Sequence, residues 1–388
     1  MRIAFYAPLK PPTHDTPSGD RRVAGLFMDA LALAGHRVEL ASTFRSLDLV
    51  GDPYRQADVR EQGVALGRRL AARWRDGPRE VRPELWFTYH LYYKAPDWLG
   101  PEVSARLGIP YVIAEASYAP KRAAGPWASG HEAAGAAIRG ADLVLCPTRH
   151  DVEGLLPLVA APQHIVLLPP FLDPSPFRAA AHAREAHRAR IAAAHGIDPA
   201  LPWIAVAAMM RPGAKLASYR ALAEALSRVQ DIEWRLLVAG DGTARAEVKA
   251  ALEAVVPGRT AYLGALSLAE VAATYAAGDL CVWPAVNEAY GMAMLEAEAA
   301  GLPVVSCALR GVPEVIEDGR TGLLATPGDG AALAARVREL LLDPARRTSM
   351  GRAAAEFVLA ERSLEAAAAR LGQALSRLEA GAARSAAA

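Results

Sequence analysis

The sequence has few cysteines and no excess of charge of either sign. Its three cysteines, Cys146, Cys281 and Cys307, form no C-x-x-C pair and no even set, so no disulfide framework is indicated and a reducing, cytoplasmic setting is expected. The 43 basic and 42 acidic residues leave a net charge of +1, which gives no field for holding a nucleic-acid backbone. The composition therefore argues against a dedicated DNA or RNA binder.

Several other sequence features are also missing. No apolar run reaches the length of a membrane span, and the first residues, MRIAFYAPLKPP, turn to proline before a signal peptide could form, so a soluble or at most peripheral protein is expected. The first strand-to-helix turn lacks G-x-G-x-x-G, which argues against a nicotinamide dehydrogenase. No G-x-x-x-x-G-K-(S/T) loop is present for a phosphate-splitting motor.

Short apolar runs alternate with alanine-rich helical stretches along the whole chain, a pattern typical of parallel sheets with crossover helices. At 388 residues, two domains are expected. The proline-rich stretch LPPFLDPSP, residues 168–176, is interpreted as the interdomain linker. We predict an α/β N-terminal domain over 1–172, an α/β C-terminal domain over 173–358, and a C-terminal helix over 359–388 that returns toward the first domain and ends in a frayed tail.

The predicted strands are as follows. In the first half they are near Arg2–Tyr6, Arg37–Leu40, Leu85–Thr88, Tyr111–Ala114, Leu143–Cys146 and Ile165–Leu168, with a helix from about Arg22 to Ala34. In the second half they are near Trp203–Ala208, Arg235–Ala239, Thr260–Leu263, Leu280–Trp283 and Pro303–Ser306.

The most informative segment is NEAYGMAMLEAEAAGLPVV, residues 287–305. It follows a predicted strand and opens a helix whose first turn holds Gly291, Met292 and Ala293, so free backbone N–H groups are available to an anionic ligand. Glu288 precedes this helix and Glu296 lies one to two turns into it. Carboxylates accept hydrogen bonds from vicinal hydroxyls, so the pair would flank a bound diphosphate and bind the sugars on either side of it.

This segment resembles the E-x7-E signature of the family 4 glycosyltransferases. The resemblance implies a GT-B fold, in which two Rossmann-like domains with parallel sheets face each other across a cleft. It also implies that Glu288 contacts the donor sugar and Glu296 the nucleotide ribose. The family retains the anomeric configuration by front-face attack, in which the leaving phosphate helps to take the acceptor proton and no protein nucleophile is needed.

Further segments match the family in the order it requires. Arg211 and Lys215, in AMMRPGAKLASY, coincide with its R-x-x-x-x-K-G loop, although the spacing is one residue shorter and Leu216 replaces the glycine. Cations there would stabilise a departing nucleoside diphosphate. Gly240 lies in a G-x-G turn, VAGDGTAR. Leu263 lies in YLGALS, which together with AAGDLCVWPA resembles the stretches near which the family binds its base and sugar. In the later string RGVPEVIEDGRTGLL, Arg310 replaces a family glycine.

The N-terminal half, where this family usually binds its acceptor, resembles it more loosely. The loop after the first strand offers a single glycine, Gly19, with Ser18 or Asp20 as a cap for the following helix. His90, at the end of a predicted strand, matches the place of a family histidine that faces the cleft. Glu115 also points toward the carboxyl edge and has no assigned role.

We therefore expect an enzyme that moves a sugar from a nucleotide-diphosphate sugar, UDP- or GDP-linked, to a hydroxyl acceptor that is a glycan, a lipid-linked molecule or a small molecule. No D-x-D triplet is present, so a metal-independent reaction without further cofactors is expected. The alternatives are a GT-B sugar-nucleotide epimerase and a catalytically silent paralogue that only binds sugar nucleotide. The basic stretch 67–82 leaves peripheral membrane contact open, although a solvated helix with Trp74 turned inward is favoured.

Overall fold

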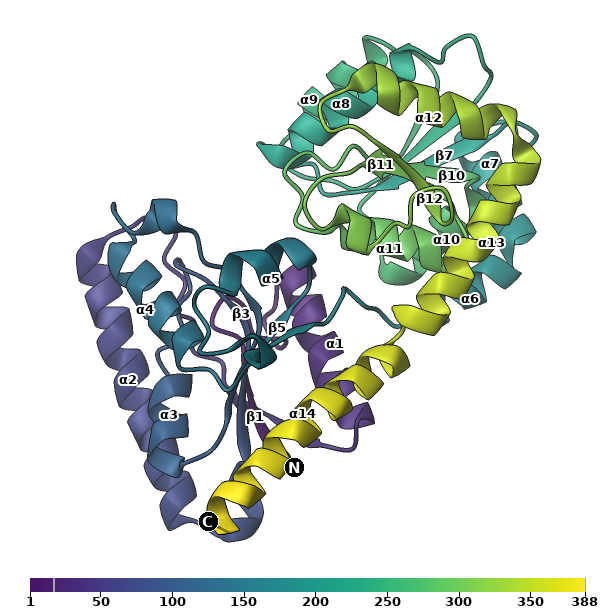
Figure 1. Cartoon of the computed structure of the whole chain (residues 1–388). Helices are drawn as coiled ribbons and strands as arrows, with labels where there is room; N and C mark the ends of the chain where they lie inside the picture. Colours follow the sequence, from purple (N-terminus) through teal and green to yellow (C-terminus); the bar gives the residue numbers. More distant parts are fainter. Residues whose placement is uncertain (17, 388) are drawn as a thin grey trace. The chain divides into compact units, whose positions relative to one another are not determined.

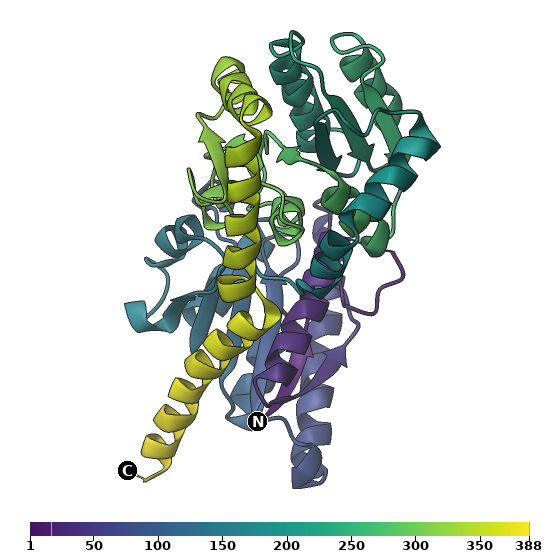
Figure 2. The same ribbon diagram turned by 90° about the vertical axis from the view of Figure 1, so that its right-hand side faces the viewer.

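The chain forms two compact α/β units, shown as a computed structural model in Figure 1. The structure describes residues 1–16 and 18–387, with side chains as far as residue 378. Unit 1 comprises Met1–Pro169 and Leu364–Ala388, and unit 2 comprises Pro170–Ser363. In each unit helices lie on both sides of a sheet, as the second view also shows (Figure 2).

Unit 1 is built on a six-stranded parallel sheet with strand order β2-β1-β3-β4-β5-β6. Because both faces of the sheet are covered, its central strands are continuous apolar runs rather than alternating ones. The strands are β1 (Arg2–Tyr6), β2 (Arg37–Ser42), β3 (Leu85–Leu91), β4 (Tyr111–Ala116), β5 (Leu143–Cys146) and β6 (Ile165–Leu167).

Two layers of helices cover this sheet. Phe27 of α1 packs against Phe87 and Tyr89 of β3 on one face, and α14 packs beside α1. On the other face Trp74 of α2 packs edge-on against Trp86 of β3. The helices are α1 (Gly19–Leu33), α2 (Pro53–Asp76), α3 (Gly100–Leu107), α4 (Ala128–Arg139), α5 (Arg149–Leu155) and α14 (Leu364–Ala387).

Unit 2 repeats this architecture with a six-stranded parallel sheet in the order β12-β11-β10-β7-β8-β9. The strands are β7 (Trp203–Ala207), β8 (Arg235–Ala239), β9 (Thr260–Gly264), β10 (Leu280–Val282), β11 (Val304–Cys307) and β12 (Gly322–Ala325). The helices are α6 (Ser175–His182), α7 (Arg184–His195), α8 (Ala214–Ser227), α9 (Arg245–Glu253), α10 (Leu268–Ala277), α11 (Met292–Ala299), α12 (Gly330–Leu342) and α13 (Pro344–Glu361).

The element boundaries differ from the sequence prediction in a few places. Helix α1 begins at Gly19 rather than near Arg22, because the Ser18 hydroxyl caps it by accepting a hydrogen bond from the Arg21 amide. Strand β12 was not predicted, since its four residues are bounded by turns. Helix α6 starts inside the predicted linker at Ser175, which is possible because proline fits the first turn of a helix.

The predicted domain boundaries, after residues 172 and 358, also differ from those in the structure. The first passage between the units lies between Pro169 and Pro170, and the second lies between Ser363 and Leu364. Helix α14 continues to Ala387, as the high helix propensity of alanine favours, and the fraying of the tail stays a prediction. Ala388 lies outside the described residues.

Candidate functional site

The loops that follow β7 and β8 in unit 2 are stacked on each other, backbone to backbone. The Met210 amide donates to the Asp241 carbonyl at 2.9 Å, and the Ala244 amide donates to the Met210 carbonyl at 2.9 Å. A Cβ atom on Gly240 would lie 2.0 Å from the Ala208 carbonyl oxygen, and the Gly240 φ is +140°. Only glycine permits this approach, so the predicted G-x-G turn supports the loop that carries Arg211.

Lys215 and Glu288, predicted from two distant motifs, meet at this edge of the sheet. Lys215 in the first turn of α8 donates from Nζ to Glu288 Oε2 at 2.5 Å. The Trp283 indole lies beside the pair, with its Nε1 3.4 Å from the same oxygen and its ring centroid 5.4 Å from the ammonium. The lysine therefore holds the Glu288 carboxylate at the carboxyl end of β10.

The segment between β10 and α11 has an unusual backbone. Ala285 and Asn287 adopt positive φ angles of 58° and 56°, and the Val286 amide between them donates to the Ser218 hydroxyl of α8 at 3.0 Å. Left-handed backbone at non-glycine residues costs about 1–3 kcal/mol each and tends to cluster at functional sites. This segment brings Glu288 to Lys215.

Helix α11 begins directly after this segment with an open N-terminus. Gly291 is its N-cap with φ of 86°, and among the described residues no side chain caps the helix. The amides of Met292 and Ala293 precede the first intrahelical hydrogen bond, which runs from Met294 to the Gly291 carbonyl at 3.0 Å. The arrangement is suited to an anion, because the amides and the helix dipole add their positive charge.

The remaining predicted residues of unit 2 are distributed around this edge. Glu296 lies in the second turn of α11 and is 8% exposed, and Leu263 is half-buried near the end of β9. Arg211 is exposed on the loop before α8. Arg310, which replaces a family glycine, adopts the left-handed φ of 48° that a glycine would tolerate.

In unit 1 the predicted His90 lies near the end of β3 beside two carboxylates. Its Nδ1 is 3.0 Å from Asp20 Oδ1 in α1 and 3.7 Å from Glu115 Oε1 in β4. The Asp20 contact has the length of a hydrogen bond but not its alignment, so it is an ion pair only when the imidazole is protonated. Gly19, the first residue of α1, is exposed and next to Asp20 in the chain.

The sequence assigns no role in the site to three of these neighbours. It places Glu115 only at the carboxyl edge of the sheet and Asp20 only as a possible helix cap. The sequence predicts Trp283 as the last residue of a strand, whereas in the structure it follows β10 and lies beside Glu288. The stretch AAGDLCVWPA, which the family places near its donor, was the one signal that could have identified Trp283.

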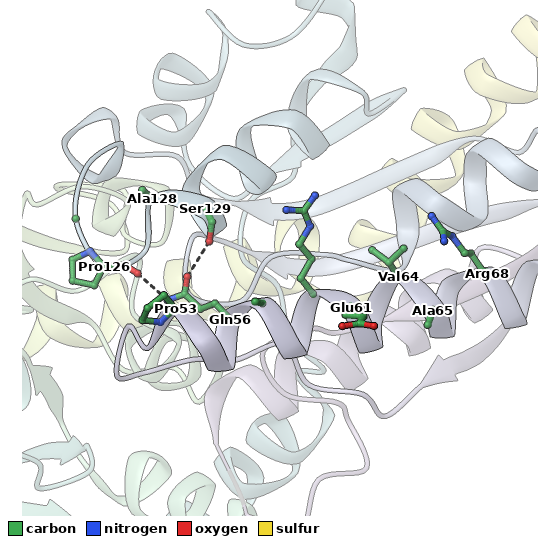
Figure 3. A pocket seen from close by; sticks show the side chains of 12 residues that line it. Pro53, Gln56, Glu61, Val64, Ala65, Arg68, Pro126, Ala128 and Ser129 are labelled. Carbon is green, nitrogen blue, oxygen red and sulfur yellow. Dashed lines mark hydrogen bonds between the residues drawn. The ribbon is translucent and has the colours of Figure 1, made fainter.

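One cavity of unit 1 lies away from these residues. It is a groove of about 670 Å³ between α2 and the segment 125–129, where Gln56 donates to the Pro126 carbonyl and accepts from Ser129 (Figure 3). None of the predicted site residues line it. Trp74, near the end of α2, is buried as predicted, so this tryptophan is not exposed for contact with a membrane.

Two features are absent from the part of the chain that the structure describes. Among residues 1–16 and 18–387, no cluster of three or more His, Cys, Asp or Glu side chains has the arrangement of a metal site. Within the same ranges, no helix is both long and apolar enough to cross a membrane.

The two parallel-sheet units of the Rossmann type place the chain in the GT-B fold class. Solved structures agree with this fold over almost the whole chain. Sucrose-phosphate synthase from Thermosynechococcus elongatus superposes with a TM-score of 0.73 at 21% identity, covering 98% of this chain and 99% of its own. HepE from Anabaena in complex with UDP gives a TM-score of 0.72 at 14% identity, covering 97% and 100%.

Sequence comparison finds similar proteins over part of the chain. Residues 203–343 match the model of the glycosyl transferases group 1. A D-inositol 3-phosphate glycosyltransferase from Pseudarthrobacter chlorophenolicus is 30% identical over 56% of this chain and 52% of its own length. The sulfoquinovosyl transferase of Arabidopsis thaliana is 37% identical over 32% of this chain and 24% of its own. The family match is limited to residues 203–343, and the chain spans about half or less of the curated relatives it matches.

Proposed function

We propose that the protein is a retaining glycosyltransferase that moves a sugar from a nucleotide-diphosphate sugar to a hydroxyl acceptor. The observation that carries this proposal is the Lys215–Glu288 ion pair at the open N-terminus of α11. A ligand that presents both a diphosphate and sugar hydroxyls matches such a site, because it supplies anionic oxygens to the cations and amides and hydroxyls to the carboxylates.

The proposed roles follow from the charges. Without ligand, Lys215 and Glu288 neutralise each other. A bound diphosphate competes for the ammonium, and the released Glu288 carboxylate then accepts a hydrogen bond from the donor sugar. Arg211, Lys215 and the amides of Met292 and Ala293 stabilise the charge that develops on the leaving phosphate. Glu296 binds the ribose, and no side chain acts as a nucleophile.

The finer assignments are part of the same proposal. A UDP-sugar is the favoured donor, because HepE is similar in fold and is found with UDP and with UDP-glucose. The absence of a D-x-D triplet supports a reaction without a metal ion. Three free, buried cysteines support a reducing, cytoplasmic setting. Unit 1 would bind the acceptor, with His90 at the carboxyl edge of its sheet.

The test is a panel of UDP-, GDP- and ADP-sugars assayed for transfer and for hydrolysis, with and without EDTA. We expect one donor to be turned over, and Glu288→Gln to lower kcat by about 10²-fold or more, because an interaction made with the transition state is lost. Glu247→Gln removes an exposed carboxylate from α9 and should leave the rate unchanged. Full activity of Glu288→Gln would refute the assignment, and formation of an epimeric sugar nucleotide from the donor without acceptor would identify an epimerase.

A further inference from the structure

Three ionisable side chains of unit 1 meet where β3, β4 and α1 come together. Asp20 Oδ1 and Glu115 Oε1 lie 3.0 Å and 3.7 Å from the same atom, His90 Nδ1. The His90 and Glu115 side chains are 20% and 19% exposed, so the group is partly withdrawn from water. Because both carboxylates approach Nδ1, Nε2 lies on the opposite side of the ring.

The backbone is strained at two of these three residues. His90 and Glu115 have φ angles of 59° and 57°, in the left-handed region that residues other than glycine rarely adopt. They lie opposite each other in the sheet, between the paired residues Tyr89 and Ala114 and the pair Leu91 and Ala116. Strain of about 1–3 kcal/mol at each position persists only where the surroundings enforce it. The fold therefore enforces a left-handed backbone at both residues, which lie on adjacent strands at this edge of the sheet.

The surrounding charges favour a protonated imidazole. Burial alone would lower the pKa of His90, but the carboxylates of Glu115 and Asp20 outweigh it and raise the pKa above its usual 6.5. Burial would raise the pKa of Asp20, yet the contact with His90 and the nearby charge of Lys10 lower it. Tyr92, whose ring lies 5.4 Å from the imidazole, has its pKa raised to about 12 by burial and by Asp20, so it stays neutral.

A simpler role does not account for the whole group. Asp20 lies in the first turn of α1, where any carboxylate is favoured by the helix dipole. That role would require neither the contact with His90 nor the left-handed backbone that places Glu115 beside it.

We propose that Asp20 and Glu115 are positioning residues that keep His90 protonated and oriented, so that its imidazolium presents Nε2–H to an oxygen of the bound substrate. A substrate oxygen placed there would receive a charge-assisted hydrogen bond, which is stronger than one from a neutral imidazole. The contact with substrate rests on the proposed function, whereas the protonation of His90 is a property of the protein without substrate.

The proton on His90 is tested directly by NMR titration of the full-length protein with labelled histidine. The signal of His90 among the nine histidines is assigned by its loss in His90→Gln. We expect His90 to titrate above 6.5, with Asp20→Asn and Glu115→Gln each lowering its pKa and the double variant lowering it most. Asp20→Glu, which keeps the carboxylate, should restore part of the shift.

Asp15→Asn is the matched control. It removes the same charge from an exposed position of the loop before α1, so it should leave the His90 titration unchanged. The proposal is overturned if His90 titrates at or below 6.5 in the unmodified protein. It is equally overturned if Asp20→Asn and Glu115→Gln shift the pKa no more than Asp15→Asn does while circular dichroism shows a native fold.

A second measurement connects the proton to catalysis. With the donor found in the panel, kcat/KM of Asp20→Asn and Glu115→Gln should fall about tenfold or more at pH 8 and recover toward that of the unmodified protein at pH 6, where the imidazole is protonated again. A loss that is equal at both pH values would indicate a structural role and contradict the proposal. If no donor is turned over, the proposed function fails, and the NMR titration still decides the protonation of His90.

Discussion

At the scale of single residues, unit 2 has a carboxyl group in its core. Glu298 of α11 is fully buried, and neither of its oxygens makes a hydrogen bond of ordinary geometry with the described residues. Burial raises its pKa well above 4.5, although Thr321 and the Arg362 guanidinium offset part of the effect. We therefore expect Glu298 to bind a proton on folding and to keep it in the folded protein.

This linkage predicts a pH-dependent gain from Glu298→Gln. Below pH 4.5 the carboxyl group is protonated in both states, so folding costs no proton uptake. As the pH rises from 5 to 7, the unfolded chain loses the proton and the folded chain keeps it. Stability then falls by about 1.4 kcal/mol per pH unit in the unmodified protein but not in the variant. Urea unfolding at pH 5 and pH 7 measures the difference, which should be larger at pH 7.

The control is Glu247→Gln, an exposed glutamate of α9, which should change stability equally little at both pH values. A gain for Glu298→Gln that does not depend on pH would mean that the group is ionised in the fold. In that case the nearby Arg362 would hold it as an ion pair.

At the scale of elements, the loops after β7 and β8 depend on each other. Gly240 approaches the Ala208 carbonyl, and a Cβ on Gly242 would lie 2.2 Å from the Met210 carbonyl oxygen. The partner in both contacts is backbone, which cannot turn aside as a flexible side chain could. The two glycines therefore fix the position of the loop that carries Arg211 and leads into α8, where Lys215 lies.

Gly240→Ala should consequently damage both stability and donor binding. We expect a loss of more than about 3 kcal/mol, because the new Cβ meets backbone in addition to adopting a positive φ. Gly258→Ala is the control, since Gly258 has φ of +69° but no atom within 4 Å of the added Cβ, and it should cost only about 1 kcal/mol. Denaturant unfolding and calorimetric titration with UDP measure the two effects. Equal losses in the two variants would contradict this view of the loops.

The sequence predicts most elements but not the contacts between distant motifs. Continuous apolar strands such as Leu143–Cys146 are recognised because buried parallel strands leave a strong pattern. Lys215 and Glu288 are each predicted from their own motif, yet their contact depends in part on the left-handed backbone at Ala285, a residue type that gives no turn signal. The His90 cluster was missed for the same reason, because strain at Glu115 has no sequence signature.

The two units of the molecule differ in whether one continuous segment of the chain forms them. Unit 2 is one segment, Pro170–Ser363, whereas unit 1 needs α14 from the far end of the chain. Helix α14 packs beside α1 and buries Leu371 and Leu375 completely. Burying each of these leucines contributes about 1.5–3 kcal/mol, a large share of the 5–15 kcal/mol that typically stabilises a domain.

Truncation after Ser363 should therefore unfold unit 1 selectively. Without α14 the side of α1 that packs against it becomes exposed, while every strand and helix of unit 2 is still present. We expect the chain 1–363 to lose one of two calorimetric transitions and to keep the other, and the segment 170–363 alone to show that remaining transition. A full-length chain carrying Leu371→Ala and Leu375→Ala should lower the midpoint of the same transition without removing any segment. If 1–363 kept both transitions unchanged, α14 would not be part of the folding unit that its buried leucines indicate.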